Sequence, residues 1–252
     1  MATRGKVEKK AAKDKDERPL NIKKYQYVFL IVCEDQKTEP QYFKQFVNLF
    51  PPKTLHIEPV GTGRDPLGVV ERAIQENVDL SKKINREVNY VWVVFDRDDA
   101  HLDEAKVKRF NTALTKAKRN NFEIAYSNEV FELWLLLHLQ DIYCLPCLNS
   151  ESLFRYPPLH RDDIYGSLQD AIRKHPNYST YIYDHRKPSK NQKNQKSVIE
   201  VIQEIGNESE AIRRAEVILK TQDGVLELIA NPSTKVHLLV QEIRHWVRYF
   251  AD

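Results

Sequence analysis

The sequence has few of the features that mark secreted, disulfide-stabilised or membrane-spanning proteins. It holds three cysteines in 252 residues, an odd and small number that argues against a disulfide framework. No stretch reaches the roughly 18 apolar residues that a membrane span needs. The N-terminus lacks the apolar segment of a secretory signal. We therefore expect a cytoplasmic protein that does not enter a membrane.

Net charge is small and unevenly spread. The whole chain carries +3, and residues 1–24 hold nine Lys and Arg against four Asp and Glu, so this segment carries +5 and the remainder −2. The segment has almost no large apolar residue, which predicts a disordered basic arm. Such an arm can touch a phosphate backbone or serve only as a solubilising extension.

Residues 25–140 alternate between apolar runs typical of buried strands and amphipathic segments typical of helices. The predicted strands are residues 25–33, 55–61, 89–95 and 122–126. The predicted helices are residues 39–49, 66–80, 102–117 and 129–139, with Thr38 and Gln41 as a capping box for the first and Asn128 as the cap of the last. Four βα repeats favour an α/β fold with a mostly parallel sheet flanked by helices.

Residues 141–252 do not continue the alternation of strand-like and helix-like segments. They are predicted to form a mainly helical C-terminal region packed against the α/β part. Helical spacing returns at residues 197–204, 208–221 and 235–250. The polar, basic stretch 183–196 predicts a mobile loop.

Two predicted strands end on acidic residues. "VFLIVC" is followed by Glu34, and "YVWVVF" is followed by Asp96, Asp98 and Asp99. The carboxyl ends of parallel strands share one sheet edge, where ligand sites of α/β proteins lie. Asp96 and Asp98 would face the same way in extended backbone. Clustered carboxylates without His or Cys favour Mg²⁺ or Mn²⁺, although single acids at strand ends are often only caps or solvated turns.

A further acid, Glu132, lies in the apolar stretch "VFELWLLLHL". A buried carboxylate without a partner is costly, so we expect it to meet either a second metal ion or a basic side chain. A rim position or a structural salt bridge is the plainer alternative.

Several residues are candidates for binding nucleic acid. The turn Gly61-Thr62-Gly63 can offer backbone N–H groups and Arg64 to a phosphate, and short glycine turns are also common without any ligand. Tyr181 and Tyr183 are available for base stacking, and Ser127 with Asn128 for substrate contact. The basic candidates are Lys37, Lys187, Lys190, Lys193 and Lys196, for which a solvated surface is the equal alternative.

Four blocks in order, "VCEDQKTEPQYF", "VVFDRDD", "AYSNEVFELWLLLH" and "NPSTKVHLLV", resemble the RloB-like family of Toprim-fold proteins over about residues 26–245. The resemblance implies that Glu34 acts as general acid or base and that Asp96 and Asp98 bind metal. We expect Asp99 or Glu132 to complete the metal shell. The resemblance also implies an Mg²⁺-dependent nuclease of an anti-phage defence or restriction locus, working beside an ABC-type ATPase.

The chain departs from the family pattern twice. Asp35 stands where a glycine is usual, which can alter the backbone approach to a phosphate, and Glu129-Val130 stand where Pro-Cys is usual. Neither departure removes a proposed catalytic residue.

Two other functions remain open. One is a non-catalytic Toprim-like subunit that binds or senses nucleic acid for a partner. The other is a phosphoacceptor receiver, with Asp96 as acceptor, Ser127 after the fourth strand and Lys187 beyond it. The second explains less, because Lys187 follows no predicted strand and Asp98 has no role in it.

Overall fold

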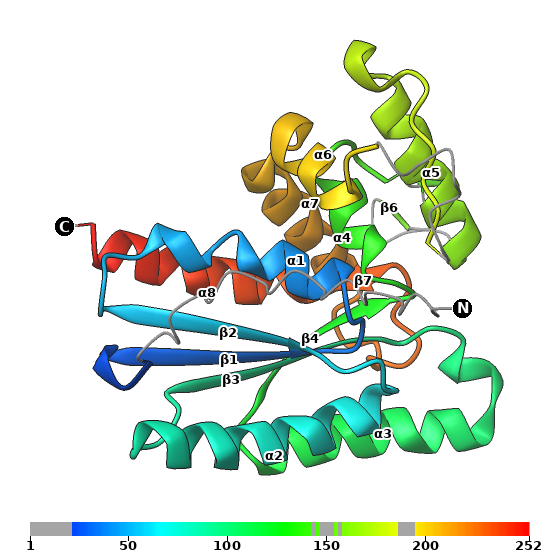
Figure 1. Cartoon of the computed structure of the whole chain (residues 1–252). Coiled ribbons are helices and arrows are strands. Elements are labelled where there is room, and N and C mark those ends of the chain that lie inside the picture. The colour runs from blue at the N-terminus through cyan, green and yellow to red at the C-terminus, as the bar shows by residue number, and fades with distance from the viewer. Residues whose placement is uncertain (1–21, 143–144, 147–153, 156–157, 186–194, 252) are drawn as a thin grey trace, which may run out of the picture.

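A sheet of order β2-β1-β3-β4-β7 runs through the computed structural model, which describes residues 22–142, 145–146, 154–155, 158–185 and 195–251 (Figure 1). The strands are β1 (Tyr27–Cys33), β2 (Leu55–Gly61), β3 (Tyr90–Asp96), β4 (Glu123–Asn128) and β7 (Ser233–Thr234). The first four pair in parallel, and β7 is antiparallel to β4. A mostly parallel α/β sheet is thus confirmed.

Helices cover both faces of this sheet (Figure 1). They are α1 (Thr38–Lys44), α2 (Pro66–Ile84), α3 (Glu104–Arg119), α4 (Glu132–Leu137), α5 (Arg161–Arg173), α6 (Val198–Ile205), α7 (Glu208–Thr221) and α8 (Val236–Tyr249). A two-stranded sheet, β5 (Leu145–Pro146) with β6 (Phe154–Arg155), lies apart from the main one. Among the described residues, no helix is both long and apolar enough to cross a bilayer.

The alternating side chains of β1 supply two hydrophobic cores. Val28, Leu30 and Val32 join the core under α2 and α3. Phe29 and Ile31 join the other core, to which α1, α4 and α8 contribute. Since a parallel strand covered on both faces must be apolar throughout, the unbroken run of β1 has its explanation here.

One of the C-terminal helices, α8, packs on the main sheet. Trp246 of α8 packs its ring 4.5 Å from that of Tyr27 and 5.7 Å from that of Tyr90, so α8 lies directly on the sheet beside α1 (Figure 1). The same core includes α6 and α7. The sequence changes in composition near residue 140, but the hydrophobic core includes residues from both sides of this boundary.

The predicted disordered arm is too long by three residues. Ile22–Lys24 form a 3-10 turn in which Ile22 is buried in the core under α2, because an isoleucine gains by leaving water. Residues 1–21 lie outside the described part. So do residues 186–194 of the basic loop, whereas Tyr183 and Lys196 at its ends are placed.

The chain order creates a switch point between β1 and β3. From β1 the chain crosses through α1 to β2 on one side, and β3 then pairs with β1 on the other side. Loops that leave neighbouring strands in opposite directions open a crevice at the carboxyl edge. The residues after β1 and β3 face that crevice.

Candidate acidic site

The acids that follow β1 and β3 meet between the strands. The backbone N–H of Asp96 donates to Oε2 of Glu34 at 3.0 Å, and the N–H of Glu34 donates to the carbonyl of Val94 at 2.9 Å. Burial raises the pKa of Glu34 to about 8, the Asp96 hydrogen bond opposes this, and Asp98 adds to it. The edge argument from sequence thus placed Glu34 beside Asp96 correctly.

Asp96 is the centre of a wider acidic cluster. Its Oδ1 is buried and has no hydrogen-bond partner among the described residues. Burial raises the pKa of Asp96 well above its usual value, and four further carboxylates add to the rise. We define the acidic cluster as Asp96 with these four residues: Glu39, Glu34, Asp98 and Glu132. A carboxylate oxygen that has no partner and is surrounded by like charge is stabilised by binding a cation or a proton.

Glu39 was missed by the sequence reasoning. It lies on α1, is 1% exposed, and accepts the N–H of Asp35 at 3.1 Å. The predicted capping box is wrong, because α1 begins at Thr38 itself and the carboxylate of Asp35 accepts the Thr38 N–H at 2.5 Å. A signal was available: Tyr42 and Phe43 lie three and four residues beyond Glu39, so this acid shares the apolar face of its helix.

Asp98 and Asp99 are not arranged as predicted. Asp98 has a φ of 51°, so the backbone after Asp96 is left-handed and not extended. Its carboxylate lies 3.2 Å from the Arg161 guanidinium at the start of α5. Asp99 pairs with Lys106 at 2.7 Å on the surface, which lowers its pKa. Asp98 therefore stays at the rim of the acidic cluster and Asp99 points outside it.

Glu132 is buried at the start of α4, and among the described residues its partner is a tyrosine hydroxyl and not a basic side chain. The hydroxyl of Tyr183 donates to Oε1 of Glu132. Burial raises the pKa of Glu132, and this hydrogen bond opposes the rise. Tyr183 is thus an orienting contact for an acidic ligand candidate, while Tyr181 is buried and packs in the core.

Arg97 is a second residue that the sequence reasoning missed, and its hydrogen bonds hold together the segments around the site. Arg97 is buried, and its guanidinium donates to Oε1 of Glu129 at 2.9 Å and to Oδ1 of Asn128 at 2.5 Å. Oε2 of Glu129 accepts the backbone N–H of Arg161 at 3.0 Å. The residue that departs from the family pattern therefore joins β3 to α5. Asn128 does not cap α4, and the Ser127 hydroxyl lies buried 3.0 Å from that of Thr234.

The glycine turn after β2 supports the site, and two of the N–H groups that were expected to offer themselves to a phosphate are bonded within the protein. The N–H groups of Thr62 and Gly63 donate to the carbonyls of Cys33 at 3.0 Å and Glu34 at 2.7 Å, so they are occupied. A Cβ on Gly61 would lie 2.6 Å from the carbonyl oxygen of Asp35. The turn therefore fixes the backbone that carries Glu34, and Arg64 beyond it is exposed.

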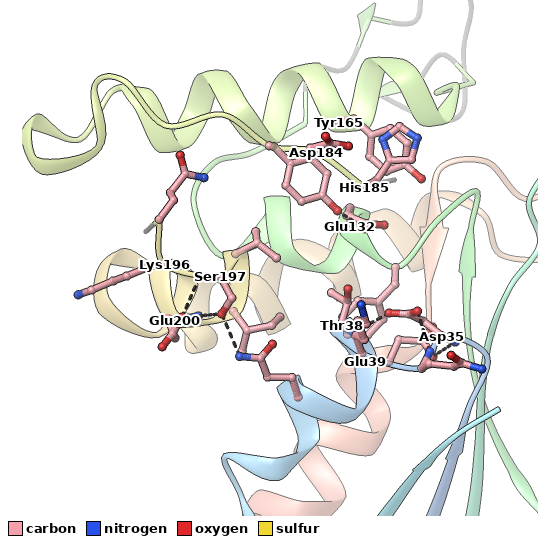
Figure 2. Close-up of a pocket in the computed structure, with 18 of the residues that line it drawn as sticks. Asp35, Thr38, Glu39, Glu132, Tyr165, Asp184, His185, Lys196, Ser197 and Glu200 are labelled. Carbon is pink, nitrogen blue, oxygen red and sulfur yellow. Dashed lines mark hydrogen bonds between the residues drawn. The ribbon is translucent and has the colours of Figure 1, made fainter. Parts of the chain in front are cut away.

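The acidic cluster opens into a cavity of about 1030 Å³ (Figure 2). Glu39, Asp96 and Glu132 line it, and Lys37 and Lys196 stand at its border. Lys196 is also paired with Glu204. The other three predicted basic contacts, Lys187, Lys190 and Lys193, lie outside the described residues.

A family model described as "RloB-like protein" matches residues 29–243. The chain belongs to the RloB-like family. Searches of curated proteins and of solved structures gave no significant match. The match begins within β1 and ends within α8, so the acidic cluster of this RloB-like protein lies wholly inside the family region.

The donor set of the RloB-like site suits a hard divalent cation. Every candidate ligand is a carboxylate oxygen, which Mg²⁺ and Mn²⁺ prefer, and Oδ1 of Asp96 is buried without a partner. However, no three Asp, Glu, His or Cys side chains of the described residues could together hold an ion as they stand. In this arrangement Glu34, Glu39, Asp98 and Glu132 each engage a protein group.

Proposed function

We propose that this RloB-like protein is an Mg²⁺- or Mn²⁺-dependent nuclease that cleaves phosphodiester bonds at the acidic cluster. The observation that carries the proposal is the buried, unpartnered Oδ1 of Asp96. It lies at the sheet's switch point, among four other carboxylates, and its side chain lines a cavity of about 1030 Å³. Proteins commonly bind Mg²⁺ through one or two carboxylates, and the ion then coordinates the phosphate of the substrate.

The residues divide into roles by position. Asp96 would anchor the metal ion, with Asp98 and Glu132 as further ligands. When bound, the ion would act as a Lewis acid and activate water. Glu34, held by the Asp96 N–H, would move a proton to or from the reacting oxygens, as a general acid or base must do within hydrogen-bond reach. Lys37 and Lys196 at the cavity border would attract the phosphate backbone.

A non-catalytic nucleic-acid-binding or sensing subunit is the second candidate. It is favoured by the fact that, in the described residues, the carboxylates around Asp96 are engaged with protein groups and none form a ready three-ligand set. In that case the acids would serve as structure, and nucleic acid would be held without cleavage.

Cleavage assays separate these candidates. The purified protein is incubated with Mg²⁺ or Mn²⁺ and labelled DNA or RNA, tRNA included. We expect metal-dependent cleavage that is lost in Asp96→Asn and in Glu34→Gln but kept in Glu123→Gln, since Glu123 is an exposed acid on β4. Binding of nucleic acid without cleavage under every metal condition would favour the sensing subunit.

We further propose that the protein is the effector of an anti-phage defence system and works in the cytoplasm with an ABC-type ATPase. Membership of the RloB-like family supports this. The test is phage plating on cells that carry this gene together with the gene of a candidate ABC-type ATPase partner. Protection that needs both genes and an intact Asp96 would support the proposal, and protection unchanged by Asp96→Asn would contradict it.

A further inference from the structure

Aromatic rings line the cavity opposite α1. The rings of Tyr165 and His185 are stacked, with centroids 4.3 Å apart and planes 17° from parallel. Tyr183 adds a third ring, 5.7 Å from that of Tyr165. We call Tyr165, Tyr183 and His185 the aromatic wall; all three line the cavity, and Figure 2 shows Tyr165 and His185 against one another near Glu132.

The aromatic wall adjoins the acidic cluster. Besides burial, Glu132, Asp96 and Asp98 all raise the pKa of Tyr165, which shows that its hydroxyl lies within electrostatic reach of the three acids. Tyr183 is fixed by its hydrogen bond to Glu132. Its neighbour in the wall, His185, is exposed, so solvent reaches this end of the wall.

Aromatic rings that line a solvent-accessible cavity can bind a flat, aromatic ligand such as a nucleobase. Every nucleobase has a π-face that stacks on aromatic side chains, whatever its sequence. In a duplex both faces of each base are covered by neighbouring bases, so a base must leave the stack before it can meet a protein ring. The wall therefore fits an unpaired base and cannot stack on a base inside a duplex.

We propose that Tyr165 and His185 form a base-stacking subsite that makes unpaired, single-stranded nucleic acid the substrate class of this protein. The inference rests on the proposed function, which puts the phosphate to be cleaved at the acidic cluster beside the wall. Tyr183 has a different role: its hydroxyl is committed to Glu132, so it orients the acid while its ring extends the wall.

The test measures binding alone. The full-length protein is titrated in EDTA, where no metal-dependent cleavage occurs, against two fluorescent probes: a single-stranded oligonucleotide without self-complementarity, and the blunt-ended duplex of the same strand with its complement. A third probe carries 2-aminopurine, whose fluorescence falls when it stacks. We expect tighter binding of the single strand and quenching of 2-aminopurine.

Variants identify the subsite. Tyr165→Leu and His185→Leu should each weaken single-strand binding by between roughly 5-fold and 100-fold, the range expected for one lost base stack. Tyr165→Phe, which keeps the ring, should bind as the wild type does. His185 is exposed, so its replacement tests the subsite even where Tyr165→Leu perturbs α5.

Equal binding of duplex and single strand, or full affinity in His185→Leu and Tyr165→Leu, would overturn the subsite and leave the rings as a packing contact between α5 and residues 181–185. This failure differs from failure of the nuclease proposal. Base stacking can hold where Mg²⁺ produces no cleavage, and cleavage dependent on Asp96 can hold where the aromatic wall has no effect.

Discussion

Raising the pH should destabilise the metal-free protein, and Glu34→Gln should remove much of that loss. Burial raises the pKa of Glu34 from its ordinary 4.5 to about 8. The unfolded chain ionises this group near pH 4.5, while the folded protein keeps the proton until about pH 8. Its contribution to stability is therefore fully present below pH 4.5 and is lost as the pH rises to and through about 8.

The size of the effect follows from linkage. One pKa unit corresponds to about 1.4 kcal/mol, so between pH 6 and pH 9 the single Glu34 carboxyl should reduce the free energy of unfolding by about 2–3 kcal/mol. For a chain of this length, that is a fall in Tm of about 4–12 °C. The pKa values of Asp96 and Glu39 are raised too, and both add in the same direction.

The assay is thermal unfolding in EDTA at pH 6 and pH 9. In Glu34→Gln the amide oxygen can still accept the Asp96 N–H, so the fold is kept while the charge is removed, and the fall in Tm should shrink by about the 4–12 °C that Glu34 contributes. Glu123→Gln, at an exposed position, should behave as the wild type. A wild-type Tm equal at both pH values, or an equal fall in Glu34→Gln, would refute the reasoning.

Two substitutions test the parts that support the site. Arg97→Ala leaves the buried Glu129 carboxylate without its cation and should cost about 3–5 kcal/mol in urea unfolding; a loss under about 1 kcal/mol would contradict it. Gly61→Ala pushes a methyl group against the carbonyl of Asp35 and should cost about 1–3 kcal/mol and reduce metal-dependent activity. Gly166→Ala on α5 meets no atom within 4 Å and should instead stabilise by about 1 kcal/mol; the reverse order of these two would count against the packing argument.

The sheet and the pairing of Glu34 with Asp96 were predictable from sequence. Buried parallel strands are continuous apolar runs, and the two that end on acids were easy to delimit. β2 was predicted at its observed bounds, Leu55–Gly61. Parallel pairing then fixes which strand ends share an edge, so two acids 62 residues apart could be placed together without coordinates.

The rest of the site depends on features that a sequence shows poorly. The left-handed turn at Asp98 is adopted by an aspartate where a glycine would have signalled it. β7 is only two residues long, too short for an alternating pattern. Helix α5 had a signal that was overlooked: Ile164, Leu168 and Ile172 recur every four residues, and all are buried.

Because helix α5 was not predicted, the contacts that it makes could not be predicted either. Arg161 beside Asp98 and the stack of Tyr165 on His185 both depend on where this helix lies. The sequence indicated Tyr181 and Tyr183 as stacking residues, but Tyr181 is buried and the Tyr183 hydroxyl is taken by Glu132. Side-chain roles of this kind follow from tertiary packing, which local patterns do not determine.

The central claim is that Asp96 and its neighbours bind a divalent cation. Calorimetric titration of Mn²⁺ into the purified protein, with a non-cleavable oligonucleotide present, tests it most directly. We predict saturable binding that Asp96→Asn weakens by at least about tenfold, the lower range for losing even a ligand's hydrogen-bond partner, and that Asp99→Asn leaves unchanged. No Mn²⁺ uptake by the wild type, or equal uptake by Asp96→Asn, would contradict the account.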